Sequence, residues 1–332
     1  MSARAVAPAL VVAAALAAAP PALADSSPGS TGAPGGTPRA QATLALSPAA
    51  GVLRDGTRRL ALRARPFTVQ GTLTPYAAGE TVDVRVTRGS RTLIARTLAV
   101  RPARGGRTGT FALSVRAFVP GRVVVHATHH ASAQLSYAHA APVHVSVVRP
   151  QASLGARGVL VRLLQQRLAA LRYAVPRSGV YDYRTELAVL AYRKVMRMAR
   201  IYSASEAVFD GLLAGRGAFH VRHPRDGHHV EARLDLQVLA LIDRGQVQRI
   251  YPLSSGKPST ATVRGRFRVY RKQPGTNSHG MVDSSYFIRG YAIHGYASVP
   301  VYPASHGCLR VPIVDARPIY DWVRIGDVVW VE

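Results

Sequence analysis

Polar and apolar positions alternate in short runs over residues 42–149. The segments FTVQGTL, ETVDVRVTR, GTFALSVRA, GRVVVHATH and APVHVSVV all have a period of two and are enriched in Val, Thr and Phe. Glycine-containing segments such as TPYAAGE and RPARGGRTG separate them. Several short strands at this spacing predict an immunoglobulin-like β-sandwich over residues 42–149.

Over residues 154–215 the apolar period becomes helical. In the first predicted helix the leucines recur at i, i+4, i+8 and i+11, on one face, as Leu160, Leu164, Leu168 and Leu171. A second helix is expected to begin at a Thr185 cap, and a third to begin at Ser203 or Ser205. The pattern predicts a small three-helix bundle.

Strand patterns return over residues 228–331 and predict a compact, mostly-β domain. VEARLDLQVLALIDRGQVQRIYPLSSG predicts two strands joined by a turn at Asp243-Arg244-Gly245. GRFRVYRK and YFIRGYAIHG predict further strands, and a helical segment is expected near PIVDARPIYDWV. In the last strand Val329 and Val331 are expected on one face and Trp330 on the other.

The N-terminal 24 residues have the layout of a secretory signal peptide, with Arg4, an apolar run and Ala-Leu-Ala before Asp25. An uncleaved anchor is the alternative, but the run is short and rich in Ala and Pro, so no stable membrane span is expected after cleavage. Residues 25–41 are rich in Ser, Gly and Pro and predict a flexible linker.

The formal net charge is +26, and almost all of the cationic residues are arginines that are spread along the chain. Such a charge favours an anionic polymer outside the cytoplasm as a partner, through long-range attraction. Export and the lack of a basic platform interleaved with aromatic residues argue against nucleic acid. Five histidines fit no closed zinc pattern, so we expect no metal and no cofactor; they are His126, His129, His130, His139 and His144.

Cys308, in YPASHGCLRV, is the single cysteine of the chain and has no intramolecular disulfide partner. A free cysteine is often an inert core residue. However, an idle thiol is a liability in an exported protein, and a thiol paired with a base is a nucleophile. His294 lies fourteen positions upstream, at the end of an apolar strand, and His306 and His279 are further candidate bases.

The residues around the cysteine suit acyl transfer. Gly307 leaves the backbone N–H groups unscreened, so that they can face a developing oxyanion. Arg310 lies two positions after the cysteine, where its charge would lower the thiol pKa or hold a carboxylate. Ser305 is better placed for a local hydrogen bond than for attack.

IHG at 293–295 followed by SHGCLR at 305–310 resembles the signature of the L,D-transpeptidase (YkuD-like) catalytic domain. The resemblance covers residues 228–331, with Val263 standing where the family commonly has proline. It implies that Cys308 is the nucleophile, that His294 is the base and that the Gly295 carbonyl orients the imidazole. It also implies that Gly307 and Cys308 donate to the oxyanion. The expected substrate-binding residues are Ser305, His306, Arg310 and Tyr286.

The helical segment 154–215 resembles the peptidoglycan-binding module of wall enzymes. The likeness rests on Leu-Gly, Leu-Gln-Gln-Arg-Leu, Gly-Val-Tyr-Asp and Thr-Glu-Leu-Ala-Val in that order, with Tyr192-Arg193 in place of the usual Phe-Gln. A purely structural spacer is the alternative.

These resemblances imply an exported, multidomain peptidoglycan L,D-transpeptidase of the cell wall. Its partners would be a donor tetrapeptide stem, from which D-alanine is released, and an acceptor amine. Two alternatives remain open: an L,D-carboxypeptidase that uses the same thiol with water, and a non-catalytic wall-binding protein. A papain-like protease is excluded because its cysteine precedes its histidine in the chain.

Overall fold

The computed structural model describes residues 38–332. The predicted signal peptide, residues 1–24, and most of the predicted linker, residues 25–41, lie outside the described residues. None of the described helices is long and apolar enough to cross a membrane.

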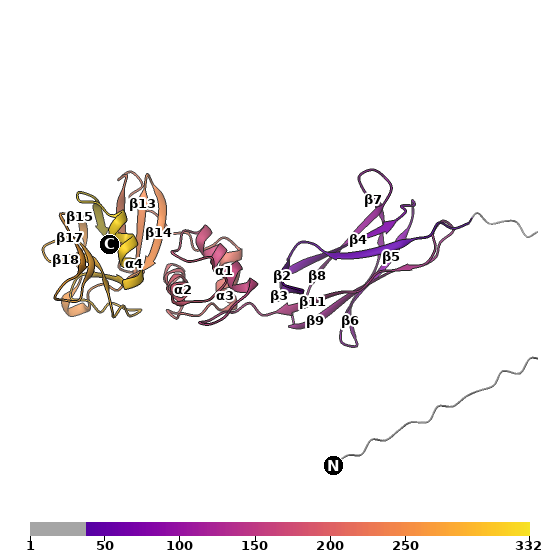
Figure 1. Ribbon diagram of the computed structural model, residues 1–332, viewed down its shortest axis with the longest axis horizontal. Helices are drawn as coiled ribbons and strands as arrows, with labels where there is room; N and C mark the ends of the chain where they lie inside the picture. Colours follow the sequence, from indigo (N-terminus) through magenta and orange to yellow (C-terminus); the bar gives the residue numbers. More distant parts are fainter. Residues whose placement is uncertain (1–37) are drawn as a thin grey trace, which may run out of the picture. The chain divides into compact units, whose positions relative to one another are not determined.

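The first β-rich segment contains two sheets (Figure 1). One has four strands in the order β1 (Thr43–Pro48), β4 (Pro66–Thr74), β8 (Gly109–Arg116) and β7 (Arg101–Pro102). The other has the order β2 (Val52–Asp55), β3 (Arg58–Leu62), β11 (Val143–Val148), β9 (Gly121–His129), β5 (Thr81–Arg88) and β6 (Arg91–Ala99), with β10 (Ala138–His139) paired to β9.

The two sheets share one apolar core, as the alternating sequence pattern predicts. On β5 the buried residues are every second one, for example Val82 and Val84, while Asp83 between them is exposed. They join Phe67 of β4 and Phe111 of β8 in the same cluster. The N-terminal segment is therefore a β-rich sandwich, and the immunoglobulin-like architecture remains a prediction.

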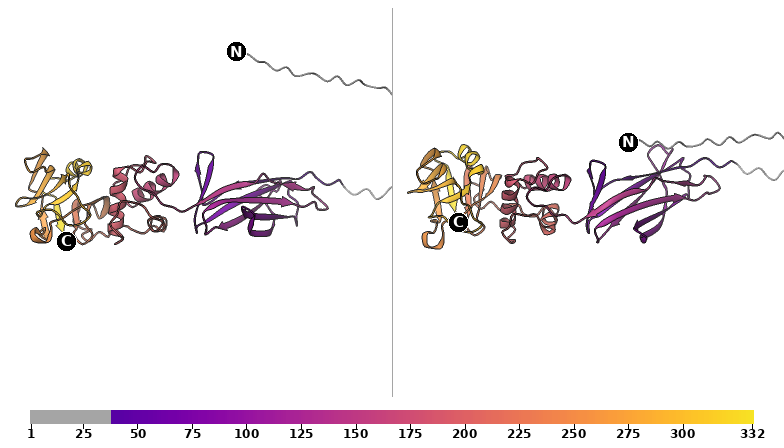
Figure 2. Two further views of the ribbon diagram at one scale, coloured as in Figure 1. Left: turned by 90° about the horizontal axis from the view of Figure 1, so that it is seen from below. Right: turned by 60° about the horizontal axis from the view of Figure 1, so that its bottom comes forward.

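Three helices follow and form a group of their own (Figures 1 and 2). They are α1 (Val159–Ala170), α2 (Tyr183–Val195) and α3 (Glu206–Leu213). Leu164 and Leu168 of α1 are fully buried, as the leucine spacing predicts, and Ser205 precedes α3 as its cap. The predicted cap of α2 is wrong. Asp182 is the cap, because its carboxylate accepts the Thr185 N–H at 2.9 Å and Thr185 lies inside the helix.

The helices share a core with the strands that follow. The cluster around Leu164 and Tyr192 also contains Val238, Ile242 and Ile250, which belong to β13 and β14. The helical segment is therefore packed directly on the edge of the C-terminal sheet, which bears on how it supports the site below.

The C-terminal segment has a five-stranded sheet and a four-stranded sheet. The first has the order β14 (Gln246–Pro252), β13 (Val238–Asp243), β12 (His229–Arg233), β20 (Val328–Val331) and β15 (Gly265–Arg268). The second has the order β16 (Arg271–Thr276), β17 (Val282–Ile288), β18 (Tyr291–Tyr296) and β19 (Leu309–Pro312). A short 3-10 helix, Pro258–Thr260, precedes β15, and α4 (Ile313–Trp322) packs on β17 and β18.

Some strand boundaries differ from the sequence predictions. The segment before residue 252 forms three strands, because an additional turn with Gln237 at φ 59° separates β12 from β13. The expected hairpin at Asp243-Arg244-Gly245 is present between β13 and β14. GRFRVYRK is divided between β15 and β16, in different sheets, and YFIRGYAIHG folds back on itself as β17 and β18. The alternation of β20 is confirmed, with Val329 and Val331 buried and Trp330 half-buried.

Candidate active site

The parallel pair β18–β19 brings the cysteine and the histidine together. His294 on β18 lies opposite Arg310 on β19, so Cys308, just before β19, is level with Ala292. Side chains two residues apart on a strand share a face, which places Cys308, Arg310 and His294 on the same side of the sheet. Cys308 and His294 are thus diagonal neighbours on adjacent strands.

These side chains line a cavity of about 310 Å³. Its lining consists of His279, Met281, His294, Tyr296, Ser305, His306, Cys308 and Arg310. Five of the residues predicted from the sequence therefore lie at one place, namely Cys308, His294, His306, Arg310 and Ser305. The cavity has the size of a small peptide pocket rather than of a wide groove.

His294 is held for one chemical role. Its ring is 3% exposed, and Nδ1 lies 2.9 Å from the Gly295 carbonyl oxygen. A carbonyl only accepts, so Nδ1 carries the hydrogen and Nε2 keeps a free lone pair. The Gly295 carbonyl thus fixes the orientation of the ring, and its role in catalysis stays a prediction. Burial, with a smaller contribution from the charge of Arg310, lowers the pKa of His294 to about 4 against the opposing effect of the Gly295 hydrogen bond. The imidazole is therefore neutral at neutral pH.

Cys308 is a thiol rather than a thiolate in this setting. Burial raises the pKa of Cys308 above its usual value, which a backbone hydrogen bond at Ala292 and the charge of Arg310 only partly offset. Its Sγ lies 3.8 Å from the Gly290 carbonyl oxygen, a long S–H···O contact. With His294 neutral as well, the pair is uncharged, so an attack by the sulfur would require transfer of the thiol proton.

The turn before the cysteine is fixed by Ser305. Its hydroxyl donates to the Cys308 carbonyl at 2.6 Å and accepts the Gly307 N–H at 3.1 Å. Ser305 lines the cavity, but it is 1% exposed and its hydroxyl is engaged in the turn; its role in substrate binding stays a prediction. One prediction needs correction here. The Gly307 N–H already has a partner, so it is not a free oxyanion donor.

Gly307 is required for a different reason. Its φ is 118°, a region that residues with a Cβ rarely adopt, and a Cβ there would overlap the Tyr291 ring. No hydrogen bond from the Cys308 N–H to another group occurs within residues 38–332. The Cys308 N–H is thus a backbone donor without a partner at the site.

Arg310 and His306 complete the lining. The Arg310 guanidinium carbon lies 4.1 Å from the centroid of the Tyr296 ring, a cation–π contact that leaves guanidinium N–H groups for a ligand. Its backbone is fixed by Ser254, which exchanges hydrogen bonds of 2.9 and 3.0 Å with it. His306 is exposed at the rim.

Sequence reasoning missed two residues of the lining and underrated a third. Tyr296 follows His294 by two positions, so strand alternation would have placed it on the same face. Met281, and His279, which had been considered only as a distant base, come from the loop between β16 and β17. Asn277 organises that loop by accepting the N–H groups of both at 3.1 and 3.0 Å, and no local sequence signal announces it.

Tyr286 lies outside the cavity, so its predicted contact with substrate is corrected. It is 5% exposed, its hydroxyl donates to Gln273 at 2.8 Å, and the Arg271 guanidinium carbon lies 4.0 Å from its ring centroid. It packs within the β16–β17 hairpin because both of its neighbours come from β16.

A polar network connects the cysteine turn to α2. Ser255 accepts the Ala304 and Ser305 N–H groups at 2.8 and 2.9 Å, and its own N–H donates to the Gln237 side chain at 2.9 Å. The buried Lys194 of α2 donates to the Leu253 and Gln237 carbonyls at 2.9 and 3.1 Å. Segment 253–255, on which the turn rests, is therefore held from the helical side.

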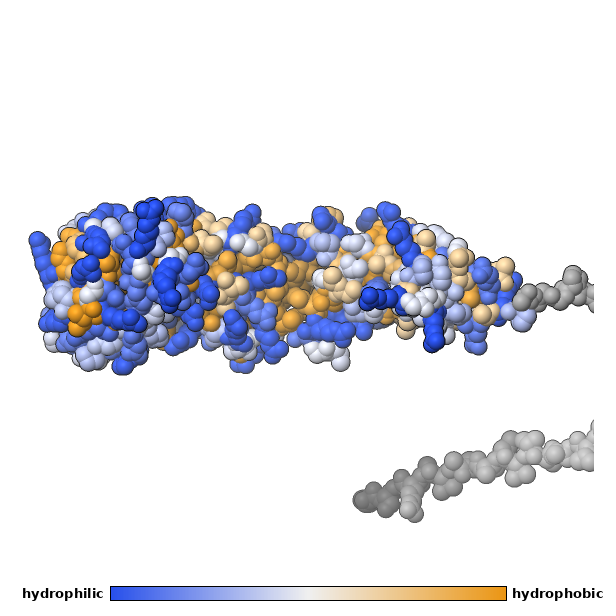
Figure 3. Space-filling view, turned by 90° about the horizontal axis from the view of Figure 1, so that it is seen from above, coloured by the Kyte–Doolittle hydropathy of each residue, from blue (hydrophilic) through white to orange (hydrophobic). Residues whose placement is uncertain are grey.

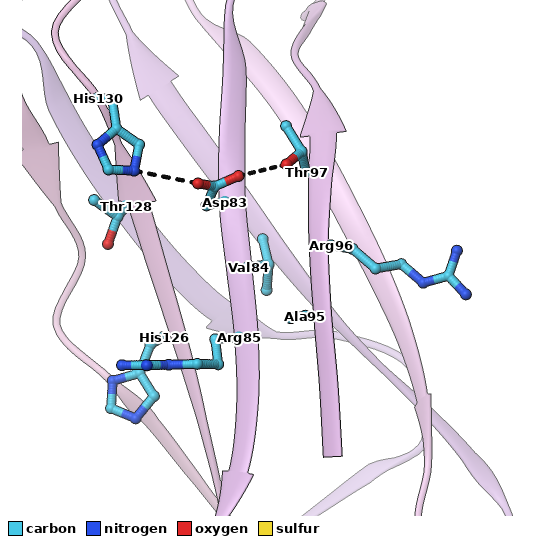
Figure 4. Close-up of a pocket in the computed structure, with 9 residues that line it drawn as sticks. All are labelled: Asp83, Val84, Arg85, Ala95, Arg96, Thr97, His126, Thr128 and His130. Atoms are coloured by element: carbon cyan, nitrogen blue, oxygen red, sulfur yellow. Dashed lines mark hydrogen bonds and ion pairs between the residues drawn. The ribbon is translucent and has the colours of Figure 1, made fainter. Parts of the chain in front are cut away.

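A second cavity, of about 530 Å³, lies on the exposed face of β5, β6 and β9 (Figure 4). Asp83 is its central acid, and it accepts from Thr97 at 2.6 Å and contacts His130 at 3.2 Å. The lining contains two histidines, two arginines and two threonines but no cysteine. No group of three His, Cys, Asp or Glu residues suited to a metal occurs in residues 38–332. This cavity offers no counterpart to the Cys308 site.

Comparison with known proteins agrees with this geometry. Residues 227–331 match the YkuD family, described as the L,D-transpeptidase catalytic domain. No curated protein matches the chain significantly. Among solved structures, the L,D-transpeptidase from Xylanimonas cellulosilytica DSM 15894 is 34% identical over 56% of this chain and 98% of that one, with a TM-score of 0.51.

Two further structures are similar over other shares of the chain. An Enterococcus faecium L,D-transpeptidase mutant is 25% identical over 38% of this chain and 62% of that one, with a TM-score of 0.30. An L,D-transpeptidase from Mycobacterium smegmatis is 13% identical over 85% of this chain and 98% of that one, with a TM-score of 0.29. The family match and the near-complete coverage of the Xylanimonas protein together show that this chain belongs to the L,D-transpeptidase family, with a YkuD catalytic domain at residues 227–331.

Proposed function

We propose that the protein is an exported peptidoglycan L,D-transpeptidase that works through an acyl-enzyme on Cys308. The observation that carries the proposal is the placement of Cys308 and a correctly oriented, neutral His294 in one cavity. A neutral imidazole with a free Nε2 is the general base that a protonated thiol requires.

The first half-reaction transfers an acyl group to the enzyme. His294 Nε2 takes the thiol proton as Sγ attacks the carbonyl of the third stem residue, and an S–C bond forms. The Cys308 N–H donates to the oxyanion. The C–N bond to D-alanine then breaks, and the imidazolium returns the proton to the leaving amine. His294 ends neutral, as it began.

The second half-reaction regenerates the thiol. An acceptor amine of a neighbouring stem attacks the thioester and gives a proton to His294. The C–S bond breaks, the new amide is the cross-link, and the proton returns to sulfur. Arg310, with unused N–H groups at the cavity, is suited to hold a stem carboxylate.

The remaining parts of the chain are proposed to keep the enzyme in the wall. The N-terminal pattern supports export, and the helical segment supports glycan binding. Residues 38–150 hold sixteen arginines and three acidic residues, a formal net charge of +13, which suits anionic wall polymers. On the face shown in Figure 3 the most hydrophilic residues are scattered, so the attraction would be diffuse and salt-sensitive.

The test is product analysis by mass spectrometry. The mature protein and a Cys308→Ala variant are incubated with a purified disaccharide-tetrapeptide. A dimer that has lost one D-alanine, absent with the variant, is expected. Tripeptide alone would assign a carboxypeptidase. Unchanged substrate from both proteins, with retention on isolated sacculi, would assign a binding role.

A further inference from the structure

A third cavity, of about 220 Å³, lies where α2, β14 and α4 meet, and it shares no lining residue with the Cys308 site. Its polar lining consists of Asp315 of α4, Tyr251 and Arg249 of β14, and Arg184 of α2. Pockets for drug-sized ligands are usually about 300–1,000 Å³, so this one suits a ligand of only a few heavy atoms.

The central observation is the state of Asp315. The residue is 5% exposed, and within residues 38–332 its carboxyl forms no hydrogen bond and no ion pair, but its oxygens are not fully enclosed and open into the cavity. Buried carboxyls are normally paired or hydrogen-bonded within the protein, so this one depends on what fills the cavity for its partners. Burial also raises the pKa of Asp315 to about 7, because the charged form of the carboxyl is poorly solvated there.

The other polar groups of the cavity are also incompletely used. Arg184 donates to the Val314 carbonyl at 3.1 Å and Arg249 to the Gln248 carbonyl at 2.8 Å. A guanidinium has five N–H donors, so both keep donors for a ligand. Both are exposed cations at the rim, whereas the acid lies in the interior.

This arrangement selects against singly charged ligands. A lone cation at Asp315 would lie beside two guanidinium groups, and a lone anion at the arginines would lie beside the acid. A ligand that carries both charges satisfies each end. The rest of the wall is made of small apolar groups, including Val175 and Pro318, which suit a short aliphatic side chain.

We propose that this cavity binds an α-amino acid zwitterion, with its ammonium group at Asp315 and its carboxylate at Arg184 and Arg249. The ligand is either a free small amino acid or the amino-acid group at the end of a peptide side chain, since the two present the same chemistry. The site is independent of the proposed reaction at Cys308.

Binding is measured by calorimetry and by ligand-observed NMR on the full mature chain carrying Cys308→Ala, so that turnover plays no part. The probes are D- and L-alanine, alaninamide, which lacks the carboxylate, and N-acetylalanine, which lacks the amine. A tripeptide ending in diaminopimelate tests the peptide source. Alanine or the tripeptide is expected to bind, and the two blocked alanines to bind at least about tenfold more weakly.

Substitutions in the cavity test whether the ligand binds there. Asp315→Asn keeps the shape and removes the charge, and Arg249→Gln alters an exposed residue without risk to folding; each should weaken binding at least about tenfold. Asp321→Asn is the control, because Asp321 is an exposed acid of the same helix that pairs with Arg317. The proposal is overturned if no probe binds, if the blocked alanines bind as tightly as the tightest unblocked probe, or if both cavity variants bind that probe like the control. None of these outcomes affects the assignment of Cys308.

Discussion

Replacing Lys194 by Met is predicted to stabilise the protein at pH 7 while lowering its activity. Lys194 is 2% exposed, and burial lowers the pKa of its ammonium from 10.5 to about 7. The unfolded chain therefore binds a proton below pH 10.5 that the folded chain binds only below about pH 7. Stability thus rises as pH increases between these values, by at most about 5 kcal/mol at 1.36 kcal/mol per unit.

The opposing effect is the loss of two hydrogen bonds. Without the amine, the Leu253 carbonyl loses its donor, at a cost of about 1–3 kcal/mol, whereas the Gln237 carbonyl keeps the Leu253 N–H at 3.0 Å. At pH 7 the removal of the buried amine outweighs this cost, by about 2–4 kcal/mol. The two effects become equal near about pH 9, above which the variant should be the less stable protein.

Activity should move in the opposite direction from stability. Lys194 holds segment 253–255, on which the cysteine turn rests, so the variant should lose kcat by about tenfold while KM changes little. The assays are urea unfolding at pH 7 and pH 10 and transpeptidation kinetics. Lys272→Met is the matched control, since its amine donates to the Tyr320 and Val323 carbonyls, away from that segment. A variant less stable at pH 7 would refute the energetic reasoning, and a more stable variant with full kcat would refute the positioning role.

Three further predictions concern the site itself. Because the pKa of His294 is about 4, the acid limb of kcat/KM should fall near pH 4, and a limb near 6.5 would contradict the buried neutral base. Because the pKa of Cys308 is raised, its alkylation by iodoacetamide should still accelerate above about pH 8.5, and a plateau below pH 7 would indicate a preformed thiolate. Gly307→Ala should lower the rate of acylation by at least about a hundredfold. Adding Tyr291→Ala should recover only the part of this loss that comes from the clash with the Tyr291 ring, because the backbone strain of about 1–3 kcal/mol remains. Full recovery of the rate would show that the positive φ of Gly307 does not limit acylation.

The proximity of Cys308 and His294 could be predicted from the sequence because its determinants are local. An apolar strand ending in His-Gly and a Ser-His-Gly-Cys turn lie only fourteen residues apart, and a parallel pairing of their strands places both side chains on one face. The helical region could also be predicted from the sequence, since the leucines of α1 repeat at the helical period and two of them are fully buried.

The errors arose where contacts are distant in sequence or where a turn lacks the usual residues. The turn between β12 and β13 relies on Gln237 in a left-handed conformation rather than on glycine. The engagement of the Gly307 N–H by Ser305 depends on the folded shape of the loop. The bond from Lys194 to the Leu253 carbonyl joins groups 59 residues apart, which no periodicity reveals.

The most direct measurement is the mass of the intact protein during reaction with the disaccharide-tetrapeptide, followed by peptide mapping of the adduct. The predicted result is an increase equal to the substrate minus D-alanine, located on Cys308 and absent from Cys308→Ala. Cross-linked product without such an adduct, or an adduct on another residue, would contradict acyl transfer through this thiol.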